Sequence, residues 1–141
     1  MTNAKSIFRM APQIIGTGAL VTLIFYFPGP WNAMRCLGLA ITVFAAVAFL
    51  TARYQLGKSF SVTAQAKQLV TFGIYSRIRN PLYVFSTLMI LGAVIAYQRP
   101  IFLVIPAALV AMQVTRAHRE AQVLEAAFGD AYREYRSRTW F

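Results

Sequence analysis

Residues 73–83 read Gly-Ile-Tyr-Ser-Arg-Ile-Arg-Asn-Pro-Leu-Tyr and stand where a basic, polar segment meets a long apolar run. The run opens at a proline, a residue that fits the first turn of a helix. Charged side chains are costly near hydrocarbon, by about 2.5–3.5 kcal/mol at the bilayer centre on insertion scales. We therefore predict that the polar side chains of this stretch bind a ligand, and that the chain before it serves as scaffold.

The composition of the 141-residue chain is that of an integral membrane protein. Hydrophobic residues make up 58% and charged residues 13%, against about 45–50% and 25% in soluble domains. The length fits one domain, residues 1–141. The net charge of +10 comes from basic residues between and after apolar blocks, which is a positive-inside pattern and does not indicate nucleic-acid binding. The single cysteine and single histidine form no metal-binding pattern, so no metal is expected.

Four apolar blocks predict an all-α fold with four transmembrane helices in two hairpins. Pro28-Gly29-Pro30 ends the first block, and Gln98-Arg99-Pro100 separates the third from the fourth. Pro106 is expected to kink the fourth helix. The predicted helices cover about residues 11–27, 33–52, 81–97 and 101–114, with a cytoplasmic loop over 53–80.

The distribution of basic residues predicts the orientation. Of fourteen lysines and arginines only Arg35 and Arg99 lie at the two short turns, so the other twelve and both termini are expected on the cytoplasmic side. After residue 115, apolar residues recur at three- to four-residue steps to about residue 138, which predicts an amphipathic cytoplasmic helix. Gly129 is expected to interrupt it, with Asp130 capping a final turn. The acidic residues all lie in this helix: Glu120, Glu125, Asp130 and Glu134.

Two polar clusters are expected to meet at one membrane face. Arg79 and Asn80 stand just before the third helix, and Arg119 and Glu120 follow the fourth. An antiparallel hairpin brings these ends together. The cluster offers a guanidinium for a carboxylate, a carboxylate for an ammonium, and tyrosine rings that stack on a planar base. That inventory suits an amino-acid-bearing nucleotide such as S-adenosylmethionine, although the spacing alone does not name the ligand.

The same residues carry a resemblance to a known family. Gly73-x-Tyr75-x-x-x-Arg79-Asn80-Pro81-x-Tyr83 is similar to the Gly-x-Tyr-x-x-x-Arg-His-Pro-x-Tyr signature of the isoprenylcysteine carboxyl methyltransferase and phospholipid methyltransferase superfamily. Downstream, Glu120-x-x-x-Leu124-x-x-x-Phe128-Gly129-x-x-Tyr132-x-x-Tyr135 resembles its second, glutamate-containing signature. The lead-in around Leu56, Gly57 and Phe60 is also similar, so the resemblance covers about residues 56–135.

The resemblance implies a membrane-embedded methyltransferase that uses S-adenosylmethionine and takes a lipophilic acceptor, such as an isoprenylcysteine carboxylate, from the membrane lipid. Arg79 and Glu120 are the candidate catalytic residues. The candidate cofactor-binding residues combine the motif matches with the two polar clusters and are Tyr75, Arg79, Asn80, Pro81, Tyr83, Arg119 and Glu120.

Two departures from the family pattern leave an alternative open. Asn80 stands where histidine is usual, and Ala121 stands where a second glutamate is common. Asparagine forms hydrogen bonds but cannot carry a proton. The alternative is a catalytically inactive relative that binds or assembles in the membrane. Simpler interpretations also exist for single residues: Arg77 as a lipid-headgroup anchor, an ion pair of Glu120 with Arg116 at i−4, and packing for Phe128, Tyr132 and Tyr135.

Overall fold

The computed structural model describes residues 2–57 and 69–141, and this part of the chain is helical. The predicted all-α class is confirmed, and the third helix has its predicted bounds. Lys58, Phe60 and Lys67 of the predicted loop lie outside the described residues. The elements in chain order are α1 (Thr2–Tyr26), α2 (Ala33–Leu56), the 3-10 turn η2 (Gly73–Ser76), α3 (Pro81–Tyr97), the 3-10 turn η3 (Pro100–Leu103), α4 (Val104–Phe128) and α5 (Asp130–Arg138).

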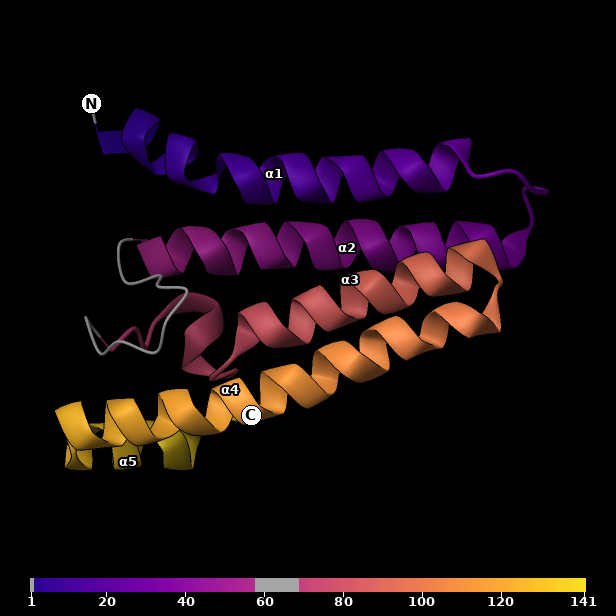
Figure 1. Ribbon diagram of the computed structural model, residues 1–141. Coiled ribbons are helices and arrows are strands. Elements are labelled where there is room, and N and C mark those ends of the chain that lie inside the picture. The colour runs from indigo at the N-terminus through magenta and orange to yellow at the C-terminus, as the bar shows by residue number, and fades with distance from the viewer. Residues whose placement is uncertain (1, 58–68) are drawn as a thin grey trace.

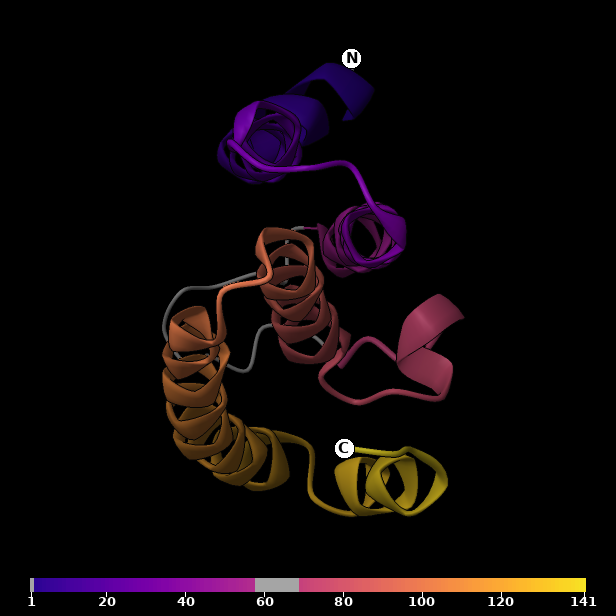
Figure 2. The same cartoon turned by 90° about the vertical axis from the view of Figure 1, so that its right-hand side faces the viewer.

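The long helices run up and down as two hairpins whose turns lie at the same end (Figure 1). The side-chain amides of Asn32 and Gln98 tie these turns together through two hydrogen bonds of 3.1 and 3.0 Å. Helix α3 lies between α2 and α4, and α5 returns beside η2 (Figure 2). The other end of the molecule therefore gathers the end of α2, η2, the start of α3 and α5.

A close crossing of α2 and α3 forms the base of the fold. Gly38 and Gly92 face each other there, and a Cβ on either glycine would overlap the backbone of the other helix. Thr42 is fully buried, and its hydroxyl donates to Gly38 O at 2.8 Å and to Met89 O at 3.3 Å. Small residues let two helix backbones approach closely, as membrane helix pairs commonly do. The second half of α3 is thus packed closely against α2.

Arg35 joins α1 to α2 at the turn end. Its side chain is 3% exposed, and its guanidinium donates to the carbonyls of Ile24, Phe27 and Gly29. It also lies 4.3 Å from the centroid of the Trp31 ring. Carbonyls in the last turn of a helix have no partner within the helix, and a cation is favourable there. The charge of Arg35 is therefore enclosed by protein.

Several predicted boundaries are wrong. Helix α1 begins at Thr2 rather than near residue 11, and α2 continues to Leu56 rather than residue 52. The predicted helices over 101–114 and 115–138 are not separate, because α4 runs unbroken through residues 104–128. Polarity changes along α4 where the apolar block ends, but its backbone hydrogen bonds continue. The end of the apolar block near residue 114 is therefore not the end of the helix.

Two predictions for the end residues of α4 and α5 also need correction. Pro106 falls in the first turn of α4. Backbone N–H groups there have no carbonyl partner within the helix, so the absence of an N–H in proline costs little. Pro106 therefore does not occupy a position that would kink the middle of the helix. Gly129, with a φ of 50°, separates α4 from α5 as expected. Asp130 is the first residue of α5, and the cap position belongs to Gly129, which makes no side-chain cap.

Two helical segments are long and apolar enough to cross a membrane, namely Ala33–Leu56 and Pro100–Phe128. The apolar parts of the other two helices are shorter, Met10–Tyr26 and Pro81–Tyr97. A helix of the length of α3 reaches about 25 Å, and the hydrocarbon core is about 30 Å thick. Four spanning helices, and their orientation, therefore stay a prediction.

Candidate functional site

The segment before α3 is seated on the end of α2. Gly73 has a φ of 62°, and a Cβ there would overlap the side chain of Gln55. The same Gln55 accepts a hydrogen bond from Ile74 N through Oε1 at 2.9 Å. The Tyr75 ring then packs against Ala52 of α2. The glycine that opens the motif is required because it allows this approach, and the approach buries Tyr75.

The hydroxyl of Tyr75 is buried without a hydrogen-bond partner among the described residues. The side chain is 6% exposed. Burial raises the pKa of this hydroxyl, and Tyr135, Glu120 and Tyr83 add to the rise while the Arg53 charge opposes it. The hydroxyl therefore stays protonated at neutral pH. Leaving such a group unpaired costs about 1–3 kcal/mol, and unpaired buried groups often mark functional sites.

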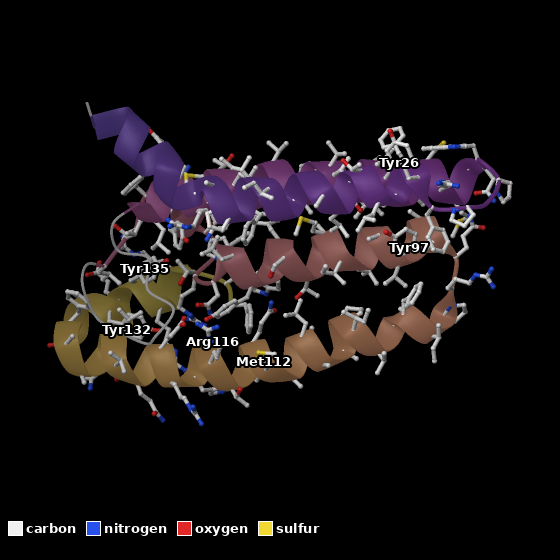
Figure 3. All side chains as sticks on the ribbon, turned by 45° about the horizontal axis from the view of Figure 1, so that its top comes forward. Tyr26, Tyr97, Met112, Arg116, Tyr132 and Tyr135 are labelled. Carbon is white, nitrogen blue, oxygen red and sulfur yellow. The ribbon has the colours of Figure 1, made fainter. Side chains whose placement is uncertain are left out.

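Glu120 of α4 meets Tyr83 of α3. The Tyr83 hydroxyl donates to Glu120 Oε1 at 2.6 Å. Arg116, one turn earlier on α4, places Nη2 at 3.8 Å from the same oxygen, and its guanidinium carbon lies 5.9 Å from the centroid of the Tyr83 ring. Figure 3 shows Arg116 projecting from α4 toward α3. The structure thus brings the motif before α3 and the glutamate of α4 together, and it also contains the Arg116–Glu120 ion pair.

Arg119 is placed differently from what we expected. It lies on the exposed face of α4, and the arginine beside Glu120 is Arg116. Adjacent residues of an α-helix are about 100° apart around the axis, so Arg119 and Glu120 face different directions. Residues four apart share a face, and this i−4 spacing was the available signal for Arg116. Whether Arg119 contacts a ligand stays a prediction.

Arg79 and Asn80 connect η2 to α3 and are half-buried. Asn80 occupies the cap position of α3, but its side chain makes no capping hydrogen bond. Pro81 follows as the first helical residue and is less than 2% exposed. The arrangement leaves the Asn80 amide unused by the helix. The proline needs no role beyond starting α3 in the required direction.

Helix α5 covers this segment through two tyrosines. Tyr132 and Tyr135 are 1% and 5% exposed, which confirms their predicted packing role. The Tyr135 hydroxyl donates to Tyr75 O at 2.8 Å. Burial raises the pKa of Tyr135 to about 12, and the Arg79 charge opposes the rise. The hydroxyl is therefore a hydrogen-bond donor at neutral pH, and the Arg79 charge lies close enough to α5 to influence it.

A polar clasp joins α3 and α4 deeper along the helices. It consists of Ser86, Thr87 and Gln113. Gln113 is 7% exposed; its Oε1 accepts from Thr87 Oγ1 at 2.8 Å and its Nε2 donates to Ser86 Oγ at 2.9 Å. Gln113 lies two helical turns before Glu120, on the same side of α4. This clasp was not predictable from the sequence, because single polar residues within apolar blocks form no recurring pattern.

The site lies within a region that matches a known protein family. A family model described as phospholipid methyltransferase matches residues 33–131, which is well over half of the chain. The matched region contains Tyr75, Tyr83 and Glu120. A search of curated proteins found no match to the chain.

Proposed function

The chain belongs to the phospholipid methyltransferase family, and on that premise we propose that it transfers a methyl group from S-adenosylmethionine to a lipophilic acceptor at the cytosolic face of a membrane. The family supports the general reaction class. The cofactor, the acceptor and the membrane side belong to our proposal. Catalytic roles for Arg79 and Glu120 belong to it as well.

The convergence of Tyr75, Tyr83 and Glu120 carries this proposal. These residues come from η2, α3 and α4. Tyr83 precedes Glu120 by 37 positions in the chain, and Tyr75 precedes it by 45. The Tyr83–Glu120 hydrogen bond of 2.6 Å fixes one oxygen of the carboxylate. The Tyr75 hydroxyl has no partner among the described residues, and after burial and Tyr135 the Glu120 charge adds to the rise of its pKa. A structural role alone does not explain why this buried hydroxyl has no partner within residues 2–57 and 69–141.

The side chains of the site fit S-adenosylmethionine chemically. When bound, that cofactor supplies the methyl group from a positively charged sulfonium. The Glu120 carboxylate is suited to its ammonium group, and Arg79 or Arg116 is suited to its carboxylate. Tyrosine rings are suited to its planar base. The Tyr75 hydroxyl, which has no acceptor in the part of the chain that the structure describes, is suited to donate a hydrogen bond to the cofactor.

The residues of the chain would act chiefly by positioning the reactants and excluding water. Tyr83 orients the Glu120 carboxylate, and Arg79 orients a carboxylate of the cofactor or of the acceptor. An acceptor that is itself a carboxylate is already anionic and needs no base. An amine acceptor must lose a proton, and Glu120 is then the candidate base.

Binding of S-adenosylmethionine, measured by calorimetry on detergent-purified protein, tests this site. Wild type should bind, and Glu120→Ala should weaken binding about tenfold or more, since a hydrogen bond to a charged group contributes about 1.5–3 kcal/mol. Glu134→Ala is the matched control, because Glu134 is an exposed carboxylate paired with Arg138 on α5. It should bind like wild type. Absence of binding by wild type at millimolar cofactor would overturn the proposal.

Methyl transfer then identifies the acceptor. Purified protein would be incubated with methyl-labelled cofactor and either phosphatidylethanolamine vesicles or a farnesylated cysteine. Label in the vesicle lipid indicates an amine acceptor, and label in the farnesylated cysteine indicates a carboxylate. Binding of the cofactor without methyl transfer to either acceptor would favour the alternative of an inactive relative. The observation that favours this alternative is Asn80, which stands where the family usually has a residue that can carry a proton.

A further inference from the structure

The chain between η2 and α3 is held by residues from the far end of the sequence. Trp140 N donates to Arg77 O at 2.8 Å, and Trp140 O accepts from Arg79 N at 2.9 Å. Asn80 N donates to Phe141 O at 2.8 Å. Trp140 and Phe141, which we call the C-terminal strap, thus lie beside residues 77–80 in a short parallel bridge.

The backbone of the strap makes these contacts. The Trp140 side chain is 66% exposed, and its ring lies 6.0 Å from that of Phe141. The side chain of Trp140 therefore adds little burial at the bridge. Its N–H and C=O groups make the hydrogen bonds, so most residue types at position 140 could keep them, but proline could not.

The strap supplies hydrogen bonds that residues 77–80 do not obtain from regular secondary structure. This segment follows a 3-10 turn and ends at the start of α3. The Tyr135 hydroxyl adds a further contact from α5 to Tyr75 O. Backbone groups at positions 75, 77, 79 and 80 consequently all have partners in the tail. Two of those positions carry Arg79 and Asn80, the polar residues of the motif.

We propose that the C-terminal strap is a positioning element of the ligand site, which holds the backbone of Arg79 and Asn80 in the conformation that binds ligand. This inference rests on the proposed function for the identity of the ligand. Without the strap, the segment would have to be ordered when the ligand binds, and ordering a flexible segment weakens affinity. The strap itself touches no reacting atom.

Two substitutions of the same residue test the proposal. Trp140→Pro removes the N–H that donates to Arg77 O and restricts the backbone, whereas Trp140→Ala keeps the N–H and removes only the exposed ring. Amide hydrogen exchange at residues 79 and 80 and the Kd for S-adenosylmethionine would be measured for both. Trp140→Pro should exchange faster and bind about tenfold more weakly, and Trp140→Ala should match wild type in both measurements.

Several results would overturn the proposal. One is equal affinity of Trp140→Pro and wild type despite faster exchange, and another is an equal loss of affinity in Trp140→Ala. Deletion of residues 140–141 repeats the test without a proline, should Trp140→Pro fail to fold. If wild type does not bind the cofactor, the proposed function fails separately. Amide hydrogen exchange at residues 79 and 80 then tests the strap without the cofactor. Faster exchange in Trp140→Pro alone supports the positioning role of the strap, and equal exchange in all variants overturns it.

Discussion

Individual side chains at the site differ in how completely their hydrogen bonds are satisfied. Tyr83 donates to Glu120, and Tyr135 donates to the backbone of Tyr75. Tyr75 is about as buried as Tyr135, but its hydroxyl has no partner among the described residues. A group of this kind lowers the stability of the ligand-free protein, and a ligand that accepts its hydrogen bond restores what is lost. Stability and binding therefore oppose each other at this position.

Removal of the Tyr75 hydroxyl should separate the two effects. Tyr75→Phe is expected to leave the melting temperature unchanged or raise it, because an unpaired polar group leaves the interior. The same variant should bind S-adenosylmethionine about fivefold to tenfold more weakly, in line with loss of one hydrogen bond worth about 1 kcal/mol. Thermal unfolding and calorimetry in detergent provide the two measurements.

Tyr26→Phe serves as the control for this prediction, since Tyr26 is 82% exposed at the other end of the molecule. It should change neither quantity. A fall in melting temperature for Tyr75→Phe would contradict the prediction, because it would mean that the hydroxyl stabilises the fold.

The sequence predicted the motif residues of the site better than their neighbours. Tyr75 and Tyr83 were predicted from the resemblance to the family motif, and Glu120 was predicted from that resemblance together with its place at one end of a hairpin. The four-residue spacing on a helix predicted the Arg116–Glu120 ion pair, whereas Arg119 lies on the exposed face of α4 and its contact with a ligand stays a prediction. The strap was not predictable, since backbone pairing by Trp140 depends on no side-chain pattern.

Among the secondary-structure elements, α3 and α4 are joined by polar contacts rather than by close packing of small residues. The clasp at Gln113 and the Tyr83–Glu120 hydrogen bond lie along one side of α4. The α2–α3 pair has the glycine crossing instead. The site is built at the polar interface. The apolar blocks predicted that these helices exist, but the helix boundary at residue 114 was wrong because α4 stays helical beyond the apolar block.

Loss of the clasp should loosen the α3–α4 interface. Gln113→Leu leaves the Ser86 and Thr87 hydroxyls without the amide and should lower the stability by about 1–2 kcal/mol, seen as a lower melting temperature. Binding of the cofactor should weaken as well, because Tyr83 and Glu120 sit on the loosened helices. Gln122→Leu is the control, since Gln122 is exposed on α4. A melting temperature of Gln113→Leu equal to wild type would contradict a stabilising clasp.

At the scale of the whole molecule, the two ends differ in the charge that they display. The end with the turns has Arg35 and Arg99, but Arg35 is enclosed by carbonyls from the end of α1 and the turn that follows it, and only Arg99 is exposed. The end with the site carries exposed arginines in the segment after η2, in α4 and in α5. This distribution supports a cytoplasmic placement of the site end, in agreement with the charge rule for membrane proteins.

Labelling of introduced cysteines tests that placement. In a Cys36→Ser background, Pro30→Cys puts a thiol in the exposed first turn, and Ser137→Cys puts one on the exposed face of α5. A membrane-impermeant maleimide should reach position 137 only from the cytoplasmic side and position 30 only from the opposite side. Labelling of both positions from one side would contradict four spanning helices with this orientation.

The contacts of Arg35 also suggest the order in which the protein is assembled during its synthesis. Arg35 binds carbonyls only 6 to 11 residues before it, so the first hairpin can close while most of the chain is still to be made. The Tyr135–Tyr75 hydrogen bond, by contrast, spans 60 residues. Contacts between distant residues form late because closing long loops is slow, and chains fold from the N-terminus as the ribosome releases them. The nascent protein therefore gains its first hairpin early, and the contact between η2 and α5 forms only after the tail has been translated.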